Sequence, residues 1–168
     1  VPEAVARARE TKVPLLFADV ADNPGGGGRG NTAWMLKAFN DAKIPGVVLG
    51  VFVDPQLAQA CHATGEGNEF DAVFNATESQ FSKRYEARAR VIKLSDGEGT
   101  GRRGVIGGKK FSLGPSALIE LVGTGTRVVV GSLRRQLCEP AMLEMHGLNI
   151  YVKEMSNDKS SLCWSSNS

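Results

Sequence analysis

The feature that most constrains this chain is a run of glycines between an apolar segment and an amphipathic one. Five of the six residues at 25–30 are glycine, within the string ADVADNPGGGGRGNT. The apolar residues before them, 13–21, have the length and composition of a buried strand. After them, apolar residues recur at helical spacing over 35–39, and Asn31 or Thr32 is placed to cap that helix. The string therefore predicts a strand, a glycine loop and a helix in direct succession.

A second strand and helix follow this strand–loop–helix unit, and another short helix precedes it. Residues 46–54 (GVVLGVFVD) are almost entirely apolar, and Asp54–Pro55 is typical of a helix start, here running to Ala63. Near the beginning, Pro2 suits the first turn of a helix that ends near Glu10. Two strand–helix units in succession predict a βαβ arrangement with parallel pairing.

After Ala63 the sequence pattern changes from strand–helix units to mostly strand-like segments. A short helix is expected at 140–146, where His146 would favour the helix dipole as a partly charged imidazole, and a last strand at 148–153. Residues 154–168 are polar and serine-rich, which predicts a loose tail. Between the helices lie strand-like segments separated by Gly, Asp and Ser turns, at 70–76, 83–94, 104–113, 116–123 and 126–133.

The expected fold class is therefore α/β with a mixed sheet: an N-terminal βαβ half with a glycine-rich loop, followed by antiparallel strands. The 168 residues, 42% hydrophobic and 23% charged, suit a single globular domain. No apolar run approaches the ~20 residues that cross a membrane, and the first residues do not resemble a signal peptide. Cysteine is present at Cys61, Cys138 and Cys163, an odd number at wide spacing, which predicts a reducing, cytoplasmic compartment.

The charge is uneven along the chain. Residues 81–135 hold twelve Lys and Arg against four Asp and Glu, so they carry +8 in a chain whose net charge is +2. Such a cluster can bind nucleic acid. However, residues 83–93 (KRYEARARVIK) alternate as a solvated strand face does, with few aromatic residues. We therefore expect a solvated face, or a domain or oligomer interface, in preference to a nucleic-acid or membrane partner.

The glycine loop is the strongest candidate for a binding site. A strand that runs into a helix start directs backbone N–H groups and the positive end of the helix dipole to one place, which suits an anion. Gly25, Gly30 and Thr32 match the phosphate-binding pattern GxxxxGK[ST], but Asn31 stands at the lysine position, which disfavours nucleotide hydrolysis. A loop that faces a binding or active site, and a loop that needs glycine only for a tight turn, both stay open.

Polar residues at the same edge of the predicted sheet would complete a site. Asp19, Asp22 and Asp54 could orient a substrate amine or support metal ligands from another domain, but Asp22 equally suits a turn cap and Asp54 a helix cap. Arg134 and Gln136 follow a strand and could line the cleft. The predicted substrate-binding residues are Asp22, Asn23, Gly25, Gly26, Gly27, Asp54, Arg134 and Gln136.

The chain is poor in metal ligands. Its two histidines are His62 and His146, and no HExxH or CxxC pattern is present. Cys61 and His62 are adjacent, so on a helix they point in different directions. Because a catalytic zinc normally takes three protein ligands, we expect no metal site and no catalytic residue in these residues.

Several separated strings resemble one known family. They are the ADNPGGG loop with Gly30-Asn31-Thr32, the Asp54–Pro55 pair, and the segments 95–121 (SDGEGTGRRGVIGGKKFSLGPSALIEL) and 127–153 (RVVVGSLRRQLCEPAMLEMHGLNIYVK). In this order they resemble the C-terminal domain of the MlrC (microcystinase C-like) family of zinc metallopeptidases, which act on peptides and related amides. The resemblance covers residues 1–153. After Lys153 the family continues with a His-containing stretch that this sequence does not match.

The resemblance implies a domain that works together with another. The family's metal ligands lie in an N-terminal domain outside these residues, so zinc would belong to the full-length enzyme and this chain alone would be inactive. Its partners would be that metal-binding domain and a peptide or amide substrate, and a homo-oligomer stays open. The chain would bind substrate and act as a scaffold, with its glycine loop facing the metal centre. The alternatives are a stand-alone anion- or phosphate-binding module and a purely structural oligomerisation domain.

Overall fold

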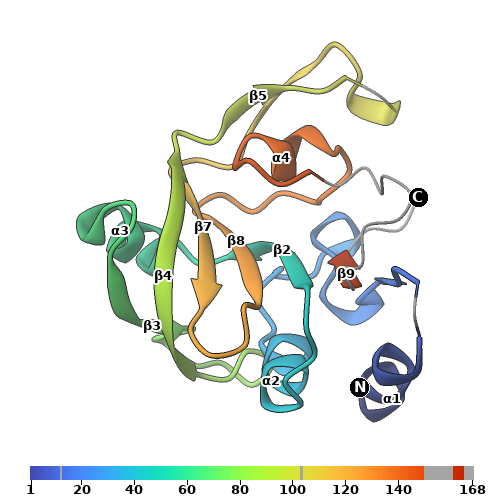
Figure 1. Cartoon of the computed structure of the whole chain (residues 1–168). Coiled ribbons are helices and arrows are strands. Elements are labelled where there is room, and N and C mark those ends of the chain that lie inside the picture. The colour runs from blue at the N-terminus through green and yellow to red at the C-terminus, as the bar shows by residue number, and fades with distance from the viewer. Residues whose placement is uncertain (12, 103, 150–160, 165–168) are drawn as a thin grey trace.

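A seven-stranded mixed sheet organises the computed structural model of this chain (Figure 1). The structure describes residues 1–11, 13–102, 104–149 and 161–164. The strands of this sheet are β1 (Leu16–Phe17), β2 (Val47–Val53), β3 (Glu69–Phe74), β4 (Tyr85–Ser95), β7 (Ser116–Leu121), β8 (Arg127–Gly131) and β9 (Ser161–Trp164). Their order across the sheet is β1-β9-β2-β8-β7-β4-β3, and β5 (Glu98–Thr100) pairs with β6 (Lys110–Ser112) in a separate hairpin.

Short helices connect and cover the strands. The α-helices are α1 (Pro2–Glu10), α2 (Trp34–Asp41), α3 (Pro55–Thr64) and α4 (Ala141–Glu144). The 3-10 turns are η1 (Val20–Asp22), η2 (Pro24–Gly26) and η3 (Gly104–Ile106). In the part of the chain that the structure describes, no helix has the length and apolar character to span a membrane.

The strand directions confirm the predicted fold class. β1, β9, β2 and β8 run parallel to one another, and β8, β7, β4 and β3 then pair antiparallel in turn. One detail of the βαβ prediction is wrong, because β1 and β2 are not neighbours. β9 lies between them and pairs with both.

β9 comes from a segment that we predicted to be a loose tail. Ser161 pairs with Val47 and Trp164 with Gly50, so the segment continues the parallel ladder of β2. The prediction failed because it used local composition alone. What stabilises β9 is the row of N–H and C=O groups that β1 and β2 present on either side, to which its backbone pairs. The other residues at 154–168, and the predicted strand at 148–153 beyond Asn149, lie outside the described residues.

The first strand is shorter and more exposed than predicted. We expected a buried strand over 13–21, but β1 has two residues, and Leu16 is 62% exposed. The chain leaves the sheet where the Asp19 side chain accepts a hydrogen bond from the N–H of Ala21 and begins η1. Because β1 is at the edge of the sheet, its apolar run is not covered on both faces.

Two apolar clusters lie on opposite faces of the sheet. Val128 belongs to one cluster and Val129 to the other, as the alternation along a strand requires. The first cluster packs under α3 and includes Phe52 and Phe74, whose rings meet edge to face with centroids 5.1 Å apart. The second packs under α4 and the β5–β6 hairpin. α1 and α2 join around a third, smaller cluster at Phe39.

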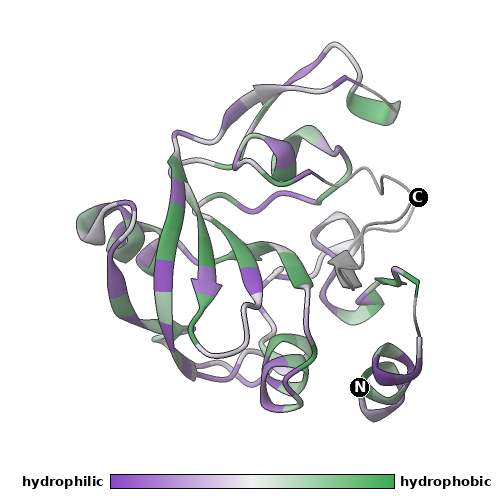
Figure 2. Cartoon of the chain, viewed as in Figure 1, coloured by the Kyte–Doolittle hydropathy of each residue, from purple (hydrophilic) through white to green (hydrophobic). Residues whose placement is uncertain are grey.

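The basic segment forms a solvated ladder of ion pairs. On β4, Arg88 and Arg90 pair with Glu69 and Asp71 of the neighbouring β3. Hydrophilic and apolar residues alternate along β4 in Figure 2. Exposed pairs of this kind contribute about 0–1 kcal/mol each to stability. Because these arginines already have anionic neighbours, the face supports the solvated interpretation and not a surface of unpaired cations.

His146 does not occupy the charged helix-end position that we predicted. Its side chain is buried, with Nδ1 3.2 Å from the carbonyl oxygen of Met142 and Nε2 3.0 Å from the Ser116 hydroxyl. A carbonyl can only accept, so Nδ1 carries the proton and Nε2 accepts from Ser116. Burial lowers the pKa of His146 to about 4. The imidazole is therefore a neutral part of the core that connects α4 to β7.

Stability should depend on pH through His146. The unfolded imidazole has a pKa of ~6.5, above the folded value of about 4, so the unfolded state binds more protons between these values. Stability is then complete above the unfolded pKa and falls as the pH drops, by about 2 kcal/mol between pH 7 and pH 5. Urea unfolding at both pH values measures this difference. His146→Gln should lower stability at pH 7 and remove most of the difference, and an unchanged difference in the variant would contradict the assignment.

Candidate functional site

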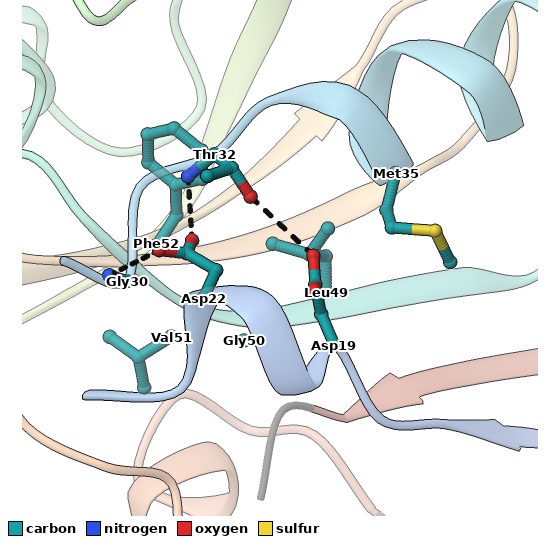
Figure 3. Close-up of a pocket in the computed structure, with 9 residues that line it drawn as sticks. All are labelled: Asp19, Asp22, Gly30, Thr32, Met35, Leu49, Gly50, Val51 and Phe52. Atoms are coloured by element: carbon teal, nitrogen blue, oxygen red, sulfur yellow. Dashed lines mark hydrogen bonds between the residues drawn. The ribbon is translucent and has the colours of Figure 1, made fainter. Parts of the chain in front are cut away.

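The glycine loop is closed by one buried carboxylate. Asp22 is 8% exposed, and its Oδ1 accepts from the N–H of Gly30 at 2.8 Å while its Oδ2 accepts from the N–H of Thr32 at 2.6 Å (Figure 3). Hydrogen bonds to a charged acceptor are stronger than neutral ones. The loop begins at Asp22, and the Asp22 side chain also binds the residues that end the loop. One residue therefore fixes both ends. The turn-capping interpretation of Asp22 is the one that this geometry supports.

All four N–H groups of residues 25–28 are used inside the loop. Asn23 accepts three of them: its Oδ1 from Gly25 at 2.9 Å, and its carbonyl oxygen from Gly26 at 3.0 Å and Gly28 at 2.8 Å. The fourth, from Gly27, goes to the carbonyl oxygen of Pro24 at 3.3 Å. A phosphate cradle needs such groups free to point at the ligand. The geometry thus disagrees with a phosphate-binding loop, and with an anion site built from these four donors.

The glycines of the loop are needed for different reasons. A Cβ on Gly28 would lie 2.7 Å from the backbone of Asp22, and a Cβ on Gly25 would lie 2.0 Å from Oε1 of Gln136. Both glycines permit close packing within this chain. A Cβ on Gly26, in contrast, would meet nothing nearer than 3.8 Å, and Gly26 has no positive φ. The described residues therefore give no steric reason for glycine at position 26.

Asp54 joins three strand ends. Its Oδ1 accepts from the N–H of Leu57 at 3.0 Å and so caps α3, as the capping interpretation predicted. Its Oδ2 accepts from the N–H of Asn75, just after β3, at 2.8 Å. The Asp54 N–H donates to the carbonyl oxygen of Gly131 at the end of β8. With 6% exposure, Asp54 is a buried junction and not a surface carboxylate.

Asn75 and Ser82 are parts of the site that the sequence analysis missed. Asn75 is 5% exposed, has φ +52°, and donates through Nδ2 to the carbonyl oxygens of Asn31 and Lys83 at 2.7 and 3.1 Å. Ser82 donates to Oδ1 of Asn31. An Asn at the end of a strand is a residue that tolerates positive φ, which could have indicated this turn. These bonds hold the β3–β4 connection against the glycine loop.

The predicted capping of α2 by Asn31 or Thr32 is wrong, because both side chains bond elsewhere. The side chain of Asn31 bonds to Ser82, and the hydroxyl of Thr32 lies 3.5 Å from Asp19, so neither side chain caps α2. The N-cap of α2 is Ala33, which makes no side-chain cap.

The segment after β8 reaches back to the glycine loop. Nη1 of Arg134 lies 3.5 Å from the carbonyl oxygen of Gly28, and Gln136 packs against Gly25. The structure therefore gathers the predicted residues Asp22, Asn23, Gly25–Gly27, Arg134 and Gln136 around one loop. Asp54 lies beside them, because the N–H of Val53 donates to the carbonyl oxygen of Gly30 at 2.8 Å.

A small pocket lies between the loop and β2 (Figure 3). Asp19 borders it, accepting from the N–H of Ala21 at 3.2 Å and from the Thr32 hydroxyl at 3.5 Å. The volume of about 30 Å³ suits one or two waters, far less than a peptide occupies. The lining residues are Asp19, Asp22, Gly30, Thr32, Met35, Leu49, Gly50, Val51 and Phe52.

Comparison with known proteins identifies the family. Residues 17–163 match the model of the MlrC C-terminus. The chain belongs to this family. It also resembles the crystal structure of a "putative metallopeptidase" from Mesorhizobium sp. BNC1, with a TM-score of 0.79 and 19% sequence identity; the match covers 99% of this chain and 32% of that one.

The match shows a shared fold, and the chain spans about a third of the length of that solved protein. A comparison with curated proteins found no match. The fold of an MlrC C-terminal domain thus accounts for nearly all of this chain.

The described residues of this MlrC C-terminal domain do not fit a zinc ion. Across 1–11, 13–102, 104–149 and 161–164, no three His, Cys, Asp or Glu side chains come close enough to hold a metal. Nε2 of His62 lies 3.1 Å from the carbonyl oxygen of Ser116. Burial raises the pKa of the Cys61 thiol to about 12, whereas metal binding requires the thiolate. Within these residues, no step of a reaction can be assigned to a metal.

In this MlrC C-terminal domain, Asp22→Ala should lower stability. The change removes the acceptor of two backbone N–H groups, one of them buried, which should cost about 2 kcal/mol. Asp19→Ala is the matched control, because it removes only a 3.2 Å bond to exposed backbone and a 3.5 Å contact. It should cost less than about 1 kcal/mol. Urea unfolding measures both, and equal losses would show that Asp22 does not anchor the loop.

Proposed function

We propose that this chain is the substrate-binding and scaffolding domain of an MlrC-type, zinc-dependent peptidase or amide hydrolase. The glycine loop would form one wall of an active site whose metal ligands lie in another domain. The observation that carries the proposal is Gly26, an exposed glycine whose Cβ would clash with nothing in this domain. A glycine without an internal reason is expected where another backbone or a ligand approaches closely. Its setting is a rigid loop, where functional residues are often positioned by a scaffold.

The donors that face a substrate would not be the amides of residues 25–28, because these are bonded within the loop. Arg134 is the better group. It is exposed, its one bond to the loop is 3.5 Å long, and a guanidinium has five N–H donors in a fixed plane. We therefore propose that Arg134 binds a substrate carboxylate or amide oxygen while the bare backbone at Gly26 lets the substrate chain lie against the loop.

The rest of the site would come from the partner domain. In this proposal zinc supplies the Lewis acid for hydrolysis and is held entirely by that domain, while this chain binds and orients the peptide or amide. The alternative of a stand-alone anion-binding module is weakened, because the N–H groups of residues 25–28 are already bonded within the loop.

A cytoplasmic location stays a prediction from cysteine usage.

Gly26→Ala in the full-length enzyme tests the proposal. Since the added methyl group meets nothing nearer than 3.8 Å in this domain, the melting temperature should not fall. Turnover should drop roughly tenfold or more, because a displacement of the substrate by about 1 Å has large kinetic effects. Gly28→Ala is the matched control, since its Cβ would lie 2.7 Å from backbone and should lower the melting temperature. Near-normal turnover of Gly26→Ala at an unchanged melting temperature would reduce the loop to a structural turn.

The proposal also predicts that the 168-residue chain alone binds less than one equivalent of zinc and cleaves no peptide. The reason is that a catalytic zinc needs about three protein ligands, and the described residues bring no such group together. Elemental analysis after dialysis measures the zinc content. One tightly held equivalent per chain would contradict the prediction.

A further inference from the structure

Two aromatic side chains are exposed beside the glycine loop. Trp34, the first residue of α2, is 52% exposed, and Phe81, in the β3–β4 connection, is 57% exposed. The apolar face of α2 is satisfied without Trp34, because Leu36 and Phe39 are its buried residues. We call Trp34 and Phe81, two exposed residues on segments joined by the Ser82–Asn31 hydrogen bond, the aromatic patch. Large apolar side chains that remain in water beside a candidate site commonly mark an interaction surface.

Both members of the patch lie on segments that hydrogen bonds hold in place. The Ser79 hydroxyl oxygen accepts from the N–H groups of Phe81 and Ser82 at 3.2 and 3.0 Å, and the Ser79 N–H donates to the carbonyl oxygen of Ser82. Ser82 in turn donates to Oδ1 of Asn31, three residues before Trp34. The same bonds that fasten the β3–β4 connection to the glycine loop therefore present Phe81 and Trp34 on adjoining segments.

The surroundings of the patch have the composition of an interface rim. Lys83 pairs with Glu78 at 3.5 Å and Arg84 pairs with Glu86 at 2.6 Å, so polar, already neutralised groups adjoin Phe81. Aromatic anchors inside a polar rim are typical of protein–protein contacts, where Trp and other aromatic residues are enriched. In the described part of the chain, Trp34 and Phe81 are also the only aromatic residues among the large exposed apolar side chains.

We propose that the aromatic patch is the surface on which the rest of the same enzyme docks. The proposal rests on the proposed function, in which this domain shares an active site with another. The match to the solved protein covers 32% of that chain, so a polypeptide of that length has about two thirds of its residues outside this domain and able to dock on it. A shared site requires the contact to border the glycine loop. The patch does so through Asn31, whereas η3, with exposed Val105, lies at the far end of the molecule from α2 (Figure 1).

Hydroxyl-radical footprinting of the full-length enzyme tests the docking. Oxidation of Trp34 and Phe81 should be roughly tenfold slower than in the 168-residue chain, because interface anchors are desolvated. Val105, 84% exposed and far from α2, should react equally in both. Equal oxidation of the aromatic residues in the two proteins would overturn the proposal. Protection that appears only at high concentration, together with a doubled mass, would also overturn it, because the occupant would then be a second copy.

Variants give an independent measurement. Trp34→Ser with Phe81→Ser in the full-length enzyme should split a single thermal transition into two, since the domains would no longer be coupled, and Val105→Ser should not. A single, unshifted transition in the double variant would contradict docking at the patch. The outcome is separable from the loop test: if Gly26→Ala abolishes turnover while Trp34 and Phe81 oxidise freely, the docking proposal alone fails. If Trp34 and Phe81 are protected from oxidation while the Gly26→Ala enzyme keeps full turnover, docking stands and the proposed function of the glycine loop fails.

Discussion

Hydrogen bonding of buried carboxylates to backbone N–H groups is the interaction on which this edge of the fold depends. Asp22 binds the N–H groups that end the glycine loop, and Asp54 binds those that start α3 and follow β3. Each of these groups would otherwise be a donor with reduced access to water, at a cost of about 1–3 kcal/mol. Two aspartates thereby fix the glycine loop, the start of α3 and the turn after β3.

This dependence changes how the glycine loop can work. A glycine-rich turn before a helix is usually read as a set of free N–H groups, but here Asn23 and Pro24 accept all four N–H groups of residues 25–28. The loop is a rigid surface with little side-chain cover, flanked by the Arg134 guanidinium and by the exposed aromatic patch. Such a surface is the basis of the proposed contacts with a substrate and a second domain.

The sequence alone determined the features that depend on neighbours along the chain. The apolar run at 46–54 and the Asp54–Pro55 start of α3 are local, since strand and helix periodicities extend over a few residues. The ordered strings that resemble the MlrC family correctly indicated the domain type. That Arg134 and Gln136 could line a cleft was a prediction from their place after a strand, and their proximity to the glycine loop came only from the structure.

Only the tertiary structure decided what depends on partners distant in sequence. The segment at 161–164 becomes β9 because β1 and β2 present backbone groups on either side of it, and His146 is neutral because folding buries its ring away from water. The spacing of residues in the sequence also could not predict that the Asn75 N–H bonds to Asp54, or that the N–H groups of residues 25–28 bond within the loop. The physical reason is the same in each case: a polar group takes the acceptor or donor that folding brings within about 3 Å, and its identity is set by the packing of the whole chain.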